Sequence, residues 1–180
     1  MSKVFFLMLS LLIYGCTKTL NYQVKKFIGK TIVLDKAMLK EIPGKQENIN
    51  TITDSLCKII IYIDSTECSA CKISNLNKYN DIYYSALKTK RYIPIMIFSP
   101  SSKKVFEVIN LLKYSDFHHS IYIDSHHHFS NNNSIPIDKR LHTFLVNKDN
   151  KVILLGDPTN NVALWNLYVK TINELYVPEN

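Results

Sequence analysis

The sequence contains few glycines and very few arginines. Only 4 of its 180 residues are glycine. They are well separated, so neither the G-x-G-x-x-G pattern nor a phosphate-binding loop is present, which excludes nucleotide binding through these motifs. Of the 22 basic residues, only Arg91 and Arg140 are arginines. Proteins that read nucleic acids depend on arginine for bidentate contacts. The formal net charge of +7 therefore does not indicate a nucleic-acid partner.

The sequence also lacks a long apolar run near its amino terminus. Residues 4–13 (VFFLMLSLLI) are too short to cross a membrane, because a transmembrane helix needs about 20 apolar residues. The run follows the positive charge of Lys3, as in a secretory signal peptide. The following Ile13-Tyr14-Gly15-Cys16 resembles the lipobox of bacterial lipoproteins. We therefore expect removal of residues 1–15, a lipid on Cys16, and an extracytoplasmic protein anchored to a membrane.

Two other interpretations of this segment stay open. It could be a buried amino-terminal strand or helix, or an ordinary cleaved signal peptide that leaves Cys16 free. Either signal-peptide interpretation places the chain outside the cytoplasm, where disulfides persist.

The remainder of the chain is long enough for one domain. A hydrophobic fraction of 46% excludes general disorder, because that much apolar side chain can form a packed core. We expect a polar tether over residues 16–26 and one domain over residues 27–180. No internal repeat is visible, and we expect a monomer.

Apolar patterning predicts alternating strands and helices. Continuous β-branched runs indicate buried strands, and apolar spacings of three and four indicate helices. We expect strands over residues 27–34, 58–64, 92–98 and 121–124, a hairpin over 141–146 and 151–155, helices over 73–87, 101–114 and 162–176, and a polar loop over 125–137. This order predicts an α/β fold with a central mixed sheet and helices on both faces.

The motif Cys68-Ser69-Ala70-Cys71 directly follows a predicted core strand and opens a predicted helix. Two cysteines at this spacing can close a disulfide. The first turn of a helix offers unpaired N–H groups and the positive end of the helix dipole, both of which stabilise a thiolate. Cysteines in such motifs have pKa values lowered to roughly 3.5–7.5. We expect Cys68 to be the exposed attacking thiol and Cys71 the resolving thiol.

With this motif, the chain resembles the thioredoxin superfamily, most closely the extracytoplasmic TlpA-like thioredoxins that are bacterial lipoproteins. The matching segments are Ile59–Ile63, Cys68–Lys72 and Thr143–Val152. The resemblance implies a thioredoxin-like three-layer sandwich and thiol–disulfide oxidoreductase activity on protein thiols or disulfides. It assigns Cys68 as nucleophile and Cys71 as resolving cysteine, and it implies no cofactor.

Two acidic residues stand where the family has tryptophan. Glu67 directly precedes Cys68, and Asp64 lies three residues earlier. A carboxylate close to Cys68 would oppose ionisation of its thiol. The positive charge of Lys72 would favour it.

Two further positions depart from the family pattern. Tyr62 occupies the place of the acid that thioredoxin has beneath its site, and Leu141 or His142 that of a cis-proline. A non-proline cis bond costs about 2.5–4 kcal/mol, so we expect a trans bond here. In the family this loop faces the two cysteines. His142 could there form an ion pair with the Cys68 thiolate or join the cysteines as a metal ligand.

The other cysteine and histidines have simpler interpretations. Cys57 opens a predicted core strand, and we interpret it as a buried apolar side chain. His126–His128, with His118 and His119, could bind a transition metal. We favour a solvated loop, because adjacent histidines rarely converge on one ion without further ligands.

Two alternatives to oxidoreductase activity stay open. Cys68, Cys71 and His142 could hold Cu(I), which soft thiolate ligands select, in a metallochaperone. Alternatively, the chain could be a redox-inert thioredoxin-like module that binds a partner, since the tryptophan and the cis-proline are both missing.

Overall fold

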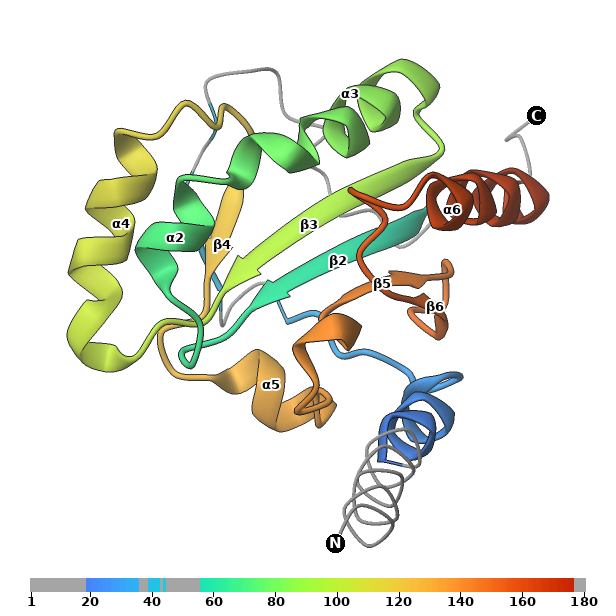
Figure 1. Ribbon diagram of the computed structural model, residues 1–180, viewed down its shortest axis with the longest axis horizontal. Helices are drawn as coiled ribbons and strands as arrows, with labels where there is room; N and C mark the ends of the chain where they lie inside the picture. The colour runs from blue at the N-terminus through green and yellow to red at the C-terminus, as the bar shows by residue number, and fades with distance from the viewer. Residues whose placement is uncertain (1–18, 36–38, 43, 45–55, 177–180) are drawn as a thin grey trace, which may run out of the picture.

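The structure, a computed structural model, describes residues 19–35, 39–42, 44 and 56–176 (Figure 1). The predicted signal peptide and Cys16 lie outside these residues. The predicted tether overlaps a helix at residues 19–27. Within the described ranges, no helix is both long enough and apolar enough to cross a membrane.

Six strands form one mixed sheet in the order β1-β4-β3-β2-β5-β6. β3 runs parallel to β2 and β4, and the other neighbouring pairs are antiparallel. The strands are β1 (Lys40–Ile42), β2 (Cys57–Ile63), β3 (Tyr92–Phe98), β4 (Ile121–Ile123), β5 (Thr143–Val146) and β6 (Val152–Leu155). The predicted mixed sheet is confirmed.

Helices cover both faces of the sheet. They are α2 (Ser69–Ile73), α3 (Asn80–Thr89), α4 (Val105–Lys113), α5 (His128–Asn133) and α6 (Val162–Leu175), with 3-10 helices η2 (Leu76–Tyr79), η3 (Ser102–Lys104) and η4 (Lys139–Leu141). β2 is buried throughout. Ile59, Ile61 and Ile63 pack with α2, α3, α4 and α6, whereas Ile60 and Tyr62 pack with Phe27 and α5. Alternate residues of a strand face opposite sides, so this division defines three layers.

The parallel strands bring their carboxyl ends to one edge of the sheet. β2 connects to β3 through α2 and α3, and β3 connects to β4 through α4 (Figure 1). Asp64, Ser99 and Asp124 follow the last residues of the three strands. The Cys68–Cys71 segment leaves β2 at the same edge, which is where ligands bind in α/β sheets.

The predicted strand over residues 27–34 is wrong. Phe27 ends the helix at residues 19–27, and Gly29, with φ +78°, turns the chain. The residues after Gly29 lie beside the start of β6 without forming a regular strand pair, and an isolated bridge joins Thr31 and Lys151. The apolar pattern reflects burial rather than strand pairing, since Phe27 and Ile32 lie in one core cluster.

The predicted helix over residues 73–87 is divided into α2, η2 and α3. Ser74 Oγ and Asn75 Nδ2 both donate to the Cys71 carbonyl, at 3.0 and 2.8 Å. Side chains that bind the backbone in this way compete with continuous helix. The division therefore has a local cause.

The predicted polar loop over residues 125–137 contains α5. The Asp124 carboxylate accepts the backbone N–H groups of His128 and Phe129, both at 2.9 Å. A side-chain acceptor at a helix start satisfies donors that lack partners within the helix.

β1 is also absent from the prediction, because three residues at the sheet edge show no clear periodicity.

Candidate functional site

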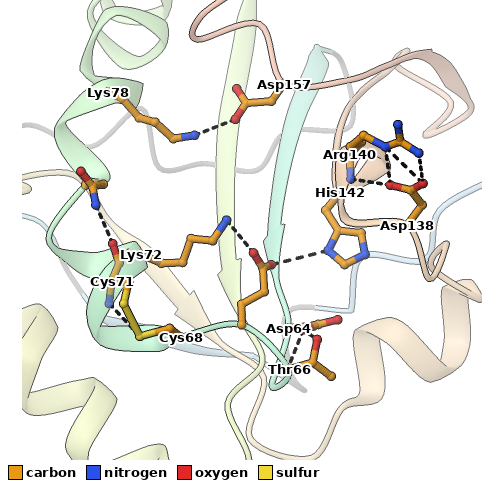
Figure 2. Close-up of polar contacts among 12 residues, drawn as sticks. Asp64, Thr66, Cys68, Cys71, Lys72, Lys78, Asp138, Arg140, His142 and Asp157 are labelled. Carbon is orange, nitrogen blue, oxygen red and sulfur yellow. Dashed lines mark hydrogen bonds and ion pairs between the residues drawn. A yellow bond between two sulfur atoms is a disulfide. The ribbon is translucent and has the colours of Figure 1, made fainter.

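Cys68 and Cys71 form a disulfide at the start of α2 (Figure 2). Their Cα atoms lie 5.3 Å apart, a separation that a disulfide spans without backbone movement. Both residues are exposed. Cys68 is also the N-cap of α2, and its Sγ accepts the backbone N–H of Cys71 at 3.3 Å. A thiolate at Cys68 would accept the same N–H.

Hydrogen bonds fix the loop between β2 and the disulfide. Asp64 Oδ1 accepts from the backbone N–H and the hydroxyl of Thr66, at 2.8 and 2.7 Å (Figure 2). The Lys72 N–H donates to the Cys68 carbonyl at 3.0 Å and begins the regular bonding of α2. Cys68 therefore follows a constrained turn as the N-cap of α2, and Cys71 lies in the first turn of that helix.

The side chain of Glu67 is almost buried, between two basic groups. It is 5% exposed, with its carboxylate 2.5 Å from Lys72 Nζ and 3.7 Å from His142 Nδ1. Burial alone would raise the pKa of the carboxyl group. The interactions with His142 and Lys72 outweigh burial and lower the pKa from about 4.5 to about 2. Glu67 is therefore ionised at neutral pH, with its charge balanced by Lys72.

His142 contacts Glu67 instead of the disulfide. Its Nε2 lies 2.8 Å from the Pro136 carbonyl. Because a carbonyl only accepts, this nitrogen carries the proton. The Nδ1–Glu67 separation of 3.7 Å is too long for a hydrogen bond, so the pair attracts through charge when His142 is protonated. Every peptide bond within the described ranges is trans, as predicted for this loop.

An open groove with a volume of about 540 Å³ lies beside the loop that leads to Cys68. One wall is residues 64–66, and a second comes from His127, Ser130 and Asn131 at α5. Tyr62, His142 and the segment 135–139 also line it. Its walls combine apolar and ionisable groups, and Thr66, which lines it, lies two residues before Cys68 in the sequence.

Two polar residues near this groove were not predicted as site residues. Ser99 and Asp124 are both fully buried, and Ser99 Oγ lies 2.7 Å from His127 Nδ1. Each directly follows an apolar strand, and that position is the signal that could have identified them. Their convergence on His127 depends on the tertiary fold.

The remaining candidates lie apart from the disulfide. Cys57 is buried and outside the disulfide, and burial raises the pKa of its thiol, as fits the predicted core role. His119 stacks on Tyr83, with ring centroids 4.2 Å apart. Burial, and then the charge of His118, lower the pKa of His119 to about 4. Among the residues that the structure describes, no three His, Cys, Asp or Glu side chains are grouped to hold a metal ion.

Solved structures share this fold. One is a thiol:disulfide interchange protein DsbE from Chlorobium tepidum, with a TM-score of 0.54 and 16% identity over 81% of this chain and 99% of that chain. Another is the exposed lipoprotein thioredoxin Etrx1 from Streptococcus pneumoniae strain TIGR4, with a TM-score of 0.51 and 16% identity over 76% of this chain and 99% of that chain. A third is a thioredoxin-like protein in its oxidised form, with a TM-score of 0.53 and 14% identity over 84% of this chain and 99% of that chain.

These likenesses confirm the predicted class: the chain is an α/β protein with a thioredoxin-like fold. No protein-family model matches the sequence, and no curated protein matches it. The structural likenesses therefore establish the fold. A proposal about function has to rest on the residues of the site.

Proposed function

We propose that the chain is a thiol–disulfide oxidoreductase that uses Cys68 and Cys71. The observation that supports this most directly is the exposed disulfide at the start of α2, on a thioredoxin-like fold. A buried cross-link would serve stability, whereas an exposed pair of neighbouring cysteines is accessible to another thiol or disulfide.

The reaction proceeds by two thiol–disulfide exchanges. In the reduced form, the Cys68 thiolate attacks one sulfur of a substrate disulfide. The Cys68–substrate bond forms as the substrate disulfide breaks, and the second substrate sulfur leaves as a thiolate. Cys71 then attacks Cys68 Sγ and releases the first substrate sulfur. Two electrons pass to the substrate, and the Cys68–Cys71 disulfide is restored. The same steps in reverse oxidise a substrate dithiol.

The surroundings of Cys68 support a stable thiolate. The Cys71 N–H lies 3.3 Å from its sulfur, and the start of a helix favours negative charge. Glu67, directly before Cys68, would oppose the thiolate. Its charge is balanced by Lys72 at 2.5 Å. The acid in place of tryptophan is therefore compatible with the proposed chemistry.

We further propose that residues 1–15 are a signal peptide and that a lipid on Cys16 anchors the protein outside the cytoplasm. The apolar run and the lipobox-like Ile13–Cys16 support this arrangement. One protein of similar fold is named an exposed lipoprotein. The substrates would then be protein thiols or disulfides outside the cytoplasm.

Turnover of a model protein disulfide tests the proposed activity. The purified full-length chain, supplied with a dithiol reductant, should reduce the substrate faster than the reductant alone. Cys68→Ser should fall to that background, because it lacks the attacking sulfur. Prereduced Cys71→Ser, mixed with the substrate after removal of the reductant, should accumulate a mixed disulfide, visible on a non-reducing gel.

Cys57→Ala is the matched control, since Cys57 is buried and outside the disulfide. It should retain turnover. Equal turnover by Cys68→Ser and the native chain would contradict the proposal.

A further inference from the structure

A series of polar side chains in contact with one another connects the buried end of the parallel sheet to the groove. Ser99 and Asp124, after β3 and β4, are both fully buried. Ser99 Oγ lies 3.3 Å from Asp124 Oδ2, 3.2 Å from the Asp124 carbonyl and 2.7 Å from His127 Nδ1. His127 lines the groove beside residues 64–66. This series of side chains therefore ends at a surface that a substrate can reach.

Asp124 also holds the backbone that positions His127. Its two carboxylate oxygens accept the N–H groups of His128 and Phe129, both at 2.9 Å. His127 itself has φ +56°, a left-handed conformation that non-glycine residues adopt infrequently. Such a conformation persists where the surrounding structure fixes it. The backbone of His127 is therefore held in place, and the contact with Ser99 orients its imidazole.

The donor and acceptor at the Ser99–His127 contact depend on the tautomer of the histidine. In the arrangement used here the Ser99 hydroxyl donates its one proton to Asp124, whose carboxylate and carbonyl only accept. The Ser99 oxygen then accepts from Nδ1–H of His127. In the neutral imidazole this leaves Nε2 with a lone pair as a proton acceptor.

Other titratable groups surround the same groove. Tyr62 on β2 forms part of it; burial raises the pKa of its hydroxyl, while the hydroxyls of Ser130 and Ser99 oppose part of that rise. Asp64, Lys139 and His142 also line it. His142 uses its Nε2 at the Pro136 carbonyl and turns Nδ1 toward Glu67. His142 Nδ1 has no hydrogen-bond partner but is buried, so we assign the proton-accepting role in the groove to His127.

We propose that His127 is the proton acceptor for a substrate thiol that enters this groove and reacts with the Cys68–Cys71 disulfide. The inference rests on the proposed oxidoreductase activity. It adds a catalytic residue that the Cys-x-x-Cys motif does not contain.

The proposed step exchanges one disulfide for another. The substrate S–H proton moves to His127 Nε2, and the resulting thiolate attacks Cys68 Sγ. The substrate–Cys68 bond forms, the Cys68–Cys71 bond breaks, and Cys71 leaves as a thiolate. The second substrate thiol passes its proton to the Cys71 thiolate and displaces Cys68, which leaves as a thiolate, so the substrate dithiol is oxidised and the protein disulfide is reduced. In the reverse reaction, protonated His127 returns the proton to the leaving thiolate.

The rate increase that a proton acceptor at His127 can provide has an upper limit. An ordinary thiol with a pKa of about 8.5 is roughly 3% ionised at pH 7. A base that ionises it completely raises the rate by at most about thirty-fold. Loss of His127 should therefore slow the reaction by about ten-fold, and by no more than about thirty-fold, at neutral pH.

The kinetic test follows oxidation of a reduced two-cysteine peptide by the oxidised full-length protein, in single turnovers from about pH 5 to 8.5, the range in which imidazole and then thiol titrate. The native rate should change little between pH 7 and 8.5, because the thiol does not have to ionise in solvent before it reacts. In His127→Asn it should be slower at pH 7 and keep rising up to the pKa of the peptide thiol. Asparagine tolerates the left-handed conformation, so the fold should be retained.

His126→Asn is the matched control, because His126 is the exposed neighbour and does not line the groove. It should keep the native profile. A native profile in His127→Asn would overturn the role of His127 while leaving the oxidoreductase proposal intact. Failure of the native protein to oxidise the peptide at any pH would overturn the role of His127, and failure also to reduce a protein disulfide would overturn both proposals.

A second measurement does not depend on activity. Nitrogen-15 NMR of the histidine rings, above the imidazole titration, should show His127 protonated at Nδ1. Ser99→Ala removes the oxygen that accepts this proton and should shift the tautomer toward Nε2–H. A native His127 protonated at Nε2 would overturn the proposal, because no lone pair would then face the substrate.

Discussion

At the scale of single residues, Glu67 determines the charge next to the disulfide. A buried carboxylate is costly unless it is paired, and an unpaired one would oppose ionisation of Cys68. Lys72 lies 2.5 Å from Glu67, and His142 lies on its other side. Glu67 and Lys72 flank the Cys68–Cys71 motif in the sequence and were predicted to influence ionisation of Cys68. The approach of His142 to the carboxylate comes from β5 pairing with β2, which no local pattern reveals.

The pKa of Glu67 gives a prediction about stability. Because the pKa is lower in the folded chain, about 2, than its ordinary value near 4.5, the unfolded chain binds the proton first as pH falls. The stabilising contribution is fully present above about pH 4.5 and is lost between there and pH 2. Urea unfolding of the native chain should show this loss.

Glu67→Gln has no carboxyl group to protonate, so this part of the pH dependence should be missing from it. The pKa of Asp157 is also affected: burial raises it, but hydrogen bonds from Lys78 and Thr159 lower it overall. A residual acid dependence should therefore remain in both proteins. Identical loss of stability by the two proteins over this range would contradict the account of Glu67.

At the scale of helices and strands, elements with strong apolar patterns were predicted and the others were not. β2, β3, the β5–β6 hairpin and α6 contain continuous or periodic apolar residues, and the structure confirms them. α5 depends instead on two N–H bonds to Asp124. The interruption after α2 depends on side chains that bind the Cys71 carbonyl. Hydrophobic periodicity does not report such bonds.

The start of α6 offers a test of this local chemistry. Asn161 is its N-cap, and its Oδ1 accepts the Leu164 N–H at 2.9 Å. Asn161→Ala should lower the free energy of unfolding by about 1 kcal/mol, measured by urea unfolding. Asn161→Ser keeps an acceptor and should lose much less. Equal losses in the two variants would contradict a capping role.

At the scale of the whole molecule, the sheet topology assembles the site. Cys68 and Cys71 could be identified from the sequence, because the Cys-x-x-Cys motif and the strand before it are close together along the chain. Ser99, Asp124 and His127 come from two strand ends and the start of α5. They meet because β3 is parallel to β4 and the chain then crosses to the other face of the sheet. A single sequence gives no distance between them, so this part of the site required the structure.

The proposed reaction requires Cys68 to be a reactive thiolate. The most direct test is the pH dependence of its alkylation in the reduced full-length protein, followed for each cysteine by mass spectrometry. We expect a midpoint for Cys68 between about pH 3.5 and 7.5, with Cys57 unreactive because it is buried. A Cys68 midpoint at or above about pH 8.5, the value of a free thiol, would contradict it.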